Sequence, residues 1–291
     1  MDKNFPSFLF HHQKFIFRNA ETSIVRFQHQ SAEIYFSLHE KKIVSLDASP
    51  FGGFLTDREI KKVDVHACLN EMYAWSTSRE ITAAVIRMFP HEYYPQFASL
   101  ITEAVLESGF NILYEDIAQY VAIKVDGSMD LGTHKRRRLR NSGMLGFQFR
   151  TLAANALDSC YDLFVQSRTS KGYPITMSLD ALREMFALFP DEYLLFGLFD
   201  EERVIAASVA IKVSDEILYC FYIGDDLEYR TQSPVTTLVS GIYEFCQGNN
   251  FSTLDLGLST DKGIINQGLY NFKKSFGALE SPKLTFIKYF E

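Results

Sequence analysis

The sequence predicts an α/β protein in which one order of strands and helices occurs twice. The chain has 291 residues, which is enough for roughly two domains. Its 47% hydrophobic and 22% charged residues are typical of a globular protein. Each half reads as antiparallel strands, then Ser49-Pro50 or Ser233-Pro234, then helix, strand, helix and strand. We therefore expect a duplicated fold with domains at 1–126 and 134–291, each a mixed, largely antiparallel sheet flanked by helices.

The elements of the first half follow from residue type and hydrophobic period. The helix expected at 94–108 has the clearest pattern, because Phe97, Ile101 and Ala104 fall on one face and Gly109 suits its end. Short β-branched and aromatic segments predict the strands. Strand-like sequence then runs to Val125. The expected elements are strands at 14–17, 23–28, 33–38 and 41–46, a turn at 49–53, a helix at 63–77, a strand at 81–89 and a linker at 126–133.

The second half is read in the same way. Leu157, Cys160 and Phe164 recur at helical spacing, and the short polar connections at 200–202 and 214–215 are typical of an antiparallel meander. The expected elements are helices at 134–142, around 157–165, at 179–189, at 234–247 and at 264–276, and strands at 146–151, 192–199, 203–213, 216–223, 252–258 and 283–289.

Charge, cysteine and histidine content exclude several classes of function. The net charge of −7 argues against a general nucleic-acid coat. The four cysteines form no C-x-x-C pair, so a zinc ribbon is not expected. All seven histidines precede residue 135, which excludes an imidazole-rich site built within the second half. The sequence has no signal-peptide pattern and no run of membrane-span length, so we expect a cytoplasmic protein with no metal and no membrane partner.

The start of the helix at 234–247 is the most informative segment. Ser233 suits the N-cap position and Pro234 suits the first helical position. A helix that begins directly after a strand points free amide donors at the strand end, an arrangement that suits a phosphate. Ordinary helix capping is the alternative interpretation of the same residues.

The order of elements over 150–290 resembles the GNAT acyltransferase fold. In that family a Gln/Arg-x-x-Gly-x-Gly/Ala loop before the central helix wraps the pyrophosphate of coenzyme A. Arg230 matches the first position of this loop, while Ser233 and Val235 stand where the family has glycine and a small residue. The resemblance implies that Arg230, Ser233 and Val235 bind the donor. The two departures favour the alternative of a non-catalytic binding or scaffold protein, since their Cβ atoms crowd an approaching phosphate.

Four short pieces are more similar to the FemAB-like branch, which joins two GNAT-type domains in tandem. They are Ser49-Pro50-Phe51-Gly52-Gly53, Ser233-Pro234, the strand segment 254–259 and the segment 271–277. Proteins of this branch transfer amino acids from aminoacyl-tRNA, or acyl groups from other donors, to amines. The resemblance implies acyl-CoA or aminoacyl-tRNA as donor, a small-molecule or peptide amine as acceptor, and contact with a tRNA acceptor end. The sequence shows no sustained heptads for the coiled-coil arm that such enzymes often carry.

Acyl transfer to an amine needs a base, donors for the developing oxyanion and an acid for the leaving group. Lys273 lies beside the apolar face of its helix and corresponds to a lysine of the FemAB-like motif, which implies that it holds a substrate anion. Asp255 is the nearest carboxylate candidate, and the resemblance to GNAT enzymes implies Tyr270 or Tyr222 as the acid. The alternatives are a solvated helix edge for Lys273, a loop-fastening role for Asp255 and core packing for Tyr270.

Two further groups are candidates for substrate contacts. Arg168 and Lys171 lie in a loop that borders the acceptor side in GNAT-like folds, and the alternative is an exposed polar loop. Tyr222 lies on the strand expected at 216–223, and its alternative is core packing. The run 134–140 holds five lysines and arginines, and without them the chain has 24 basic and 36 acidic residues, a net charge of −12. This run is either a phosphate contact or a solvated helix face. It has no interleaved aromatics, so extended nucleic-acid binding is not expected.

Overall fold

The computed structural model describes residues 7–19, 22–125 and 127–290 and divides the chain into two compact units. Unit 1 comprises Met1–Ala118, Leu258–Asn266 and Glu280–Glu291, and unit 2 comprises Gln119–Gly257 and Gln267–Leu279. This division differs from the expected domains 1–126 and 134–291, because 258–266 and the C-terminal strand belong to unit 1. Position 126, the first of the expected linker, lies outside the described residues.

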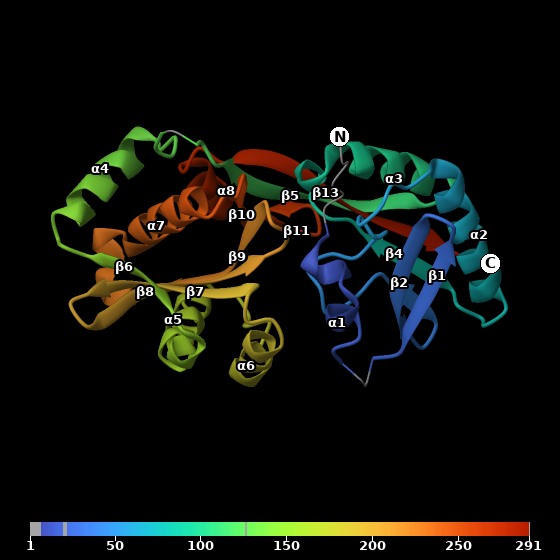
Figure 1. The fold of residues 1–291 in the computed structure, drawn as a ribbon, viewed down its shortest axis with the longest axis horizontal. Coiled ribbons are helices and arrows are strands. Elements are labelled where there is room, and N and C mark those ends of the chain that lie inside the picture. The colour runs from blue at the N-terminus through green and yellow to red at the C-terminus, as the bar shows by residue number, and fades with distance from the viewer. Residues whose placement is uncertain (1–6, 20–21, 126, 291) are drawn as a thin grey trace. The chain divides into compact units, whose positions relative to one another are not determined.

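Unit 1 is a sheet in which β3 and β4 are parallel and β1, β2 and β3 are antiparallel, as are β4 and β13. The strand order is β1-β2-β3-β4-β13-β5. Helices α2 and α3 pack together, and α2 also contacts β1 and β2 (Figure 1). The elements are η1 (Leu9–His11), α1 (Gln13–Ile16), β1 (Ile24–His29), β2 (Ala32–His39), β3 (Lys42–Val44), α2 (Lys62–Thr77), β4 (Ala83–Arg87), η2 (His91–Tyr93), α3 (Pro95–Glu107), β5 (Asn111–Ala122, which ends in unit 2), β11 (Thr260–Asp261), β12 (Ile264–Ile265) and β13 (Leu279–Tyr289, which begins in unit 2).

One predicted element of this unit is wrong, and so is the predicted start of a helix whose remainder, Gln267–Lys274, forms in unit 2. The segment 14–17 lies mostly in helix α1, where the His12 side chain accepts the Lys14 amide and the turn buries Phe15 and Ile16. The segment 264–276 is not one helix, because Ile264–Ile265 forms β12 with β11 and both isoleucines are exposed. Gly263 turns this hairpin with φ +80°, and its amide donates to the Asp116 carboxylate at 3.0 Å.

Unit 2 is a sheet with helices on both faces. Its strand order is β5-β10-β9-β8-β7-β6, with β6 to β9 antiparallel and β10 parallel to β9. Helices α5 and α6 pack on one face, and α7, with α4 against it, packs on the other (Figure 1). The elements are α4 (Thr133–Gly143), β6 (Gln148–Leu152), η3 (Ala154–Ala156), α5 (Leu157–Thr169), α6 (Leu179–Leu188), β7 (Tyr193–Asp200), β8 (Arg203–Lys212), β9 (Ile217–Asp225), η4 (Leu227–Gln232), α7 (Pro234–Gly248), β10 (Thr253–Leu258) and α8 (Gln267–Lys274).

The main core of unit 2 lies between α7 and the sheet. Leu238, Val239 and Ile242 of α7 are buried against Phe196 and Leu254 of the strands. The apolar stripe expected on helix 234–247 is therefore the face that packs on the sheet. Helix α7 does not begin directly after a strand, because the 3-10 helix η4 lies between the end of β9 at Asp225 and Pro234.

Candidate active site in the second unit

The strands β9 and β10 pair over only three positions and then separate. Their parallel register joins Ile217 to Thr253, Leu218 to Leu254 and Tyr219 to Asp255, and β9 then continues to Asp225. Strand β9 remains paired with β8 along this length, with a register shift between Val209 and Ala210. Because the β9–β10 ladder stops at Tyr219 and Asp255, the backbone beyond these residues is free of the partner strand. We call this place the strand split.

Gly257 lies just beyond the split, and two side chains satisfy its backbone. Its amide donates to Asp255 Oδ1 at 2.6 Å, and its carbonyl accepts from Lys273 Nζ at 2.8 Å. Gly257 has φ +80°, and a Cβ there would lie 3.2 Å from Cε2 of the Tyr219 ring. A buried strand amide and carbonyl must find partners. The two side chains take the place of a ladder partner and so stabilise the strand split.

Lys273 is a buried cation at this place. Its residue is 5% exposed, on the last turn of α8, with Asp255 3% exposed beside it. Burial lowers the pKa of the Lys273 ammonium to about 7, and the nearby Asp255 charge acts in the opposite direction. A lysine with this pKa exchanges its proton near neutral pH. The alternative of a solvated helix edge for Lys273 is therefore wrong.

Two further groups at the split were not expected as site residues. The ring of Tyr219 packs against Gly257, and burial, with the Asp255 charge, raises the pKa of the Tyr219 hydroxyl. Burial likewise raises the pKa of the Cys220 thiol to about 12, so this thiol is protonated at neutral pH. The signal for Tyr219 was its position opposite Asp255, which only the strand register shows.

The start of α7 holds the residues expected to bind a donor. Ser233 is the N-cap residue, but its backbone is left-handed (φ 59°) and its side chain makes no cap hydrogen bond. The side-chain capping expected of Ser233 is therefore wrong, while Pro234 occupies the first helical position as expected. Arg230 donates to Asp225 at 3.1 Å and to Ser170 at 2.8 Å. Val235 follows in the first turn and packs against the core.

The residues expected on the acceptor side are held by protein groups. Arg168 donates to the Pro174 carbonyl at 2.7 Å and lies over the Tyr222 ring at 5.3 Å. The Lys171 ammonium donates to Ser167 at 3.1 Å, and burial lowers its pKa. Tyr222 is buried, and its hydroxyl accepts the amides of Thr176 and Met177 at 3.1 and 2.9 Å. This arrangement fits the core-packing alternative for Tyr222.

Tyr270 and Lys274 lie together on α8, one turn apart. The Lys274 ammonium lies 3.5 Å from the Tyr270 hydroxyl, and the Tyr270 carbonyl accepts from Gln119 at 3.4 Å. Tyr270 is half-buried and Lys274 is exposed. The structure thus gives Tyr270 a cationic neighbour at its hydroxyl.

Helix α4 contains the basic run and separates it into two sets. Lys135 points inward, with Nζ 3.2 Å from the Thr236 hydroxyl and 3.9 and 3.8 Å from the ring centres of Phe272 and Phe276. Burial lowers the Lys135 pKa to about 7. The arginines of α4 are exposed.

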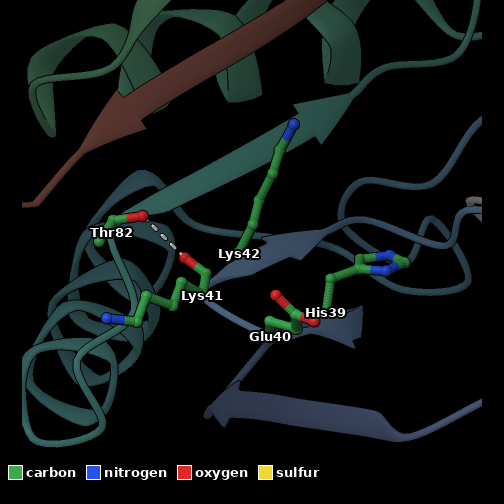
Figure 2. Close-up of a pocket in the computed structure, with 5 residues that line it drawn as sticks. All are labelled: His39, Glu40, Lys41, Lys42 and Thr82. Atoms are coloured by element: carbon green, nitrogen blue, oxygen red, sulfur yellow. Dashed lines mark hydrogen bonds between the residues drawn. The ribbon is translucent and has the colours of Figure 1, made fainter.

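A separate depression lies in unit 1 at the turn between β2 and β3. It is lined by His39, Glu40, Lys41, Lys42 and Thr82, and Thr82 donates to the Lys41 carbonyl at 2.9 Å (Figure 2). It is open to solvent, and none of the expected site residues lines it. In residues 7–19, 22–125 and 127–290, no group of three or more His, Cys, Asp or Glu is arranged to hold a metal ion.

Comparison with known proteins assigns the second half of the chain to a family. Residues 133–274 match the model of the acetyltransferase (GNAT) domain. This part of the chain is a GNAT domain. It contains α4 to α8 with β6 to β10, and hence the strand split and both buried lysines. The expected resemblance to the GNAT superfamily is thereby confirmed.

Solved structures share the fold over nearly the whole chain. The structure of FemX matches with a TM-score of 0.73 and 11% identity, covering 99% of this chain and 94% of that one. A domain of a putative lysylphosphatidylglycerol synthetase from Agrobacterium fabrum matches with a TM-score of 0.60 and 11% identity, covering 92% and 84%. A tandem GNAT protein from the clavulanic acid biosynthesis pathway matches with a TM-score of 0.51 and 9% identity, covering 89% and 79%.

These matches confirm the predicted fold class, which this chain shares with FemX and with a tandem GNAT protein. No curated protein matches this sequence. Within the part of the chain that the structure describes, no helix has the length and apolar character needed to cross a bilayer.

Proposed function

We propose that the protein is an N-acyltransferase that moves an acyl or aminoacyl group to an amine at the strand split. The observation that carries this proposal is the end of the β9–β10 ladder at Tyr219 and Asp255, directly beside the Lys273 ammonium. Backbone groups beyond that point can hold the carbonyl of a donor. The GNAT assignment of the domain supports the same reaction class.

The reaction is a single displacement. The amine nitrogen forms a bond to the donor carbonyl carbon, and the bond from that carbon to the donor sulfur or oxygen breaks. The acceptor enters as an ammonium and loses protons to a base, and the leaving thiolate or alkoxide takes one up. An amide and a free thiol or hydroxyl result, with no change in oxidation state.

The chain's own groups supply charge and proton transfer. Lys273, when protonated, stabilises the negative charge that develops on the carbonyl oxygen, and its pKa of about 7 lets it exchange a proton at neutral pH. Asp255 is a positioning residue, because it holds the Gly257 amide and its charge favours the protonated lysine. Tyr270, which lies on α8 together with Lys273, is the proposed acid for the leaving group.

The donor is either an acyl-CoA or an aminoacyl-tRNA, and the residues at the start of α7 favour one of the two. Ser233 takes the left-handed conformation that a glycine would provide, but it adds a Cβ at the position where the GNAT loop has glycine. Arg230 is already paired with Asp225. Both features favour an aminoacyl ester such as aminoacyl-tRNA over a coenzyme A thioester, and so does the fold shared with FemX. Arg168 and Lys171 remain the proposed contacts to an acidic acceptor.

The same two features favour a second candidate, a GNAT-fold binding protein without catalysis. In that case Arg230 and Asp225 fasten the α5–β9 junction, and Ser233 closes the donor site. Binding of donor without turnover distinguishes this candidate from the enzyme.

The test supplies both donors in separate assays. The purified chain is incubated with radiolabelled acetyl-CoA or with labelled aminoacyl-tRNA over a panel of amines and amino-terminal peptides, and amide product is counted. We expect turnover with one donor, lost in Lys273→Met and kept in Lys274→Met, a matched change on the exposed side of α8. Product from neither donor refutes the enzyme, and donor binding without product establishes the binding protein.

A further inference from the structure

Helix α4 presents a cationic outer face. His134, Arg136, Arg137, Arg138 and Arg140 are exposed. Its inner stripe is Lys135, Leu139 and Ser142, at the i, i+4, i+7 spacing of a face that packs on a neighbouring helix. The Thr237 hydroxyl donates to Ser142 at 2.6 Å, which fixes this inner stripe against α7. The packing of this inner stripe on α7 therefore directs the arginines toward solvent.

These four arginines carry unneutralised charge. Within the described residues none of them forms an ion pair, and Arg136 donates to the Leu131 carbonyl at 3.2 Å. Some arginines elsewhere in the chain do form ion pairs, for example Arg183 with Asp158 and Arg203 with Asp226. Without the basic run, the chain has a net charge of −12. An anionic surface would attract this one face and repel the rest of the chain.

The apolar end of the same face indicates which anionic surface fits. Met144 is 75% exposed and Leu145 is 50% exposed, directly after α4. Helical spacing places Arg137, Arg140 and Met144 at i, i+3 and i+7, in one line on the outer side. A polynucleotide backbone needs the charge alone, and this segment offers no aromatic side chain for base stacking. A lipid surface uses both the charge and the exposed aliphatic side chains.

We propose that α4 and the Met144-Leu145 tip dock the protein on an anionic lipid surface. The arginines pair with lipid phosphates, and the two aliphatic side chains enter the headgroup region. The sequence led us to expect no membrane partner because it contains no membrane-spanning segment. A helix that lies in the membrane interface needs no such segment. This proposal is independent of the proposed acyl transfer.

The experiment is co-sedimentation of the full chain with phosphatidylcholine vesicles, with and without phosphatidylglycerol. We expect binding only when phosphatidylglycerol is present. The double variant Arg137→Gln/Arg140→Gln is expected to bind about 25-fold more weakly, at about fivefold for each charge. Met144→Ser/Leu145→Ser is expected to lose about tenfold. The control Lys41→Gln/Lys42→Gln removes the same charge from the unit 1 depression and is expected to bind as the wild type.

Three results would overturn the proposal: no binding to anionic vesicles, equal loss in the lysine control, or full binding by Met144→Ser/Leu145→Ser. A parallel titration with a single-stranded RNA identifies the competing partner. If RNA binding exceeds vesicle binding and needs the arginines but not Met144 and Leu145, the face is a nucleic-acid contact. All substituted side chains are exposed, so unchanged thermal unfolding verifies that each variant is folded.

Discussion

Two regions of the GNAT domain each bury a lysine, and their surroundings differ. In the seam between α4, α7 and α8, Lys135 lies between the Phe272 and Phe276 rings, 3.9 and 3.8 Å from their centres, and donates to the Thr236 hydroxyl. At the strand split, Lys273 donates to the Gly257 carbonyl at 2.8 Å, with Asp255 close by. Burial lowers the pKa of both ammonium groups to about 7.

The comparison teaches that burial and pKa alone do not identify a catalytic lysine. Aromatic rings attract a cation through their negative faces, but they accept no proton. Lys135 therefore joins three helices without access to a reaction. Lys273 lies where a strand ladder ends, beside a carboxylate and a carbonyl, and can act on a bound carbonyl. Phe272 lies just before Lys273 on α8, and Phe276 lies just after the end of α8. The packing of both rings on Lys135 therefore also positions the helix that carries Lys273.

The largest expected effect is on turnover in the two lysine variants. Lys273→Met is expected to lower kcat by about 100-fold or more, the usual contribution of a proton-transferring group. Lys135→Met is expected to keep kcat within about threefold, because methionine fills the same aromatic seam. Steady-state rates with the active donor measure both. Equal losses in the two variants would show that burial, and not the strand split, determines activity.

Asp255→Asn is expected to shift the pH profile of turnover. Asparagine still accepts the Gly257 amide, but it removes the negative charge that favours the Lys273 ammonium. The Lys273 pKa then falls further, so the limb of the rate profile that it controls moves to lower pH. The profile of kcat against pH measures this shift. If this limb of the profile does not shift, the Asp255 charge does not influence the Lys273 pKa.

Stability should depend on pH through both lysines with the same sign. Their pKa values are lowered in the folded state, so between about pH 7 and the unfolded value the unfolded chain binds more protons. The free energy of unfolding therefore rises with pH in this window, by at most about 1.4 kcal/mol per pH unit for each lysine. Urea unfolding of the wild type, Lys135→Met and Lys273→Met should show one such contribution absent from each variant. A slope unchanged in a variant would mean that its lysine is not desolvated.

The smallest effect expected is on stability in Gly257→Ala. The added Cβ would lie 3.2 Å from the Tyr219 ring. The alanine would also have to keep the φ of +80° that Gly257 has, a conformation that residues with side chains rarely adopt. We expect a loss of about 1–2 kcal/mol in the free energy of unfolding. Gly248→Ala, near the end of α7 with open space around it, serves as control and should not be destabilised by contact. Equal changes in both would mean that the split tolerates a side chain.

Local sequence patterns predicted much of the fold and part of the site. The period of Leu238, Val239 and Ile242 located α7 and its buried face, and the meander of β7 to β9 followed from short polar connections. Asp255 and Lys273, both candidates from short sequence motifs, lie together at the strand split. These features depend on residues close in sequence.

The features that local patterns did not predict depend on long-range pairing. Strand β13 pairs with β4, so it belongs to unit 1 although the sequence order placed it in the second domain. Tyr219 joins the site through its register with Asp255. Lys135 stands in a run of arginines, and its burial depends on the Phe272 and Phe276 rings far along the chain. The spacing of Lys135, Leu139 and Ser142 was the available signal for that buried face.

The most direct measurement is a structure of the protein with a non-reactive analogue of its active donor, in which a ketone replaces the ester or thioester. We expect the ketone oxygen between β9 and β10, within hydrogen-bond distance of backbone beyond Tyr219 or of Lys273 Nζ. A ketone bound elsewhere would contradict the assignment of the strand split as the place of transfer.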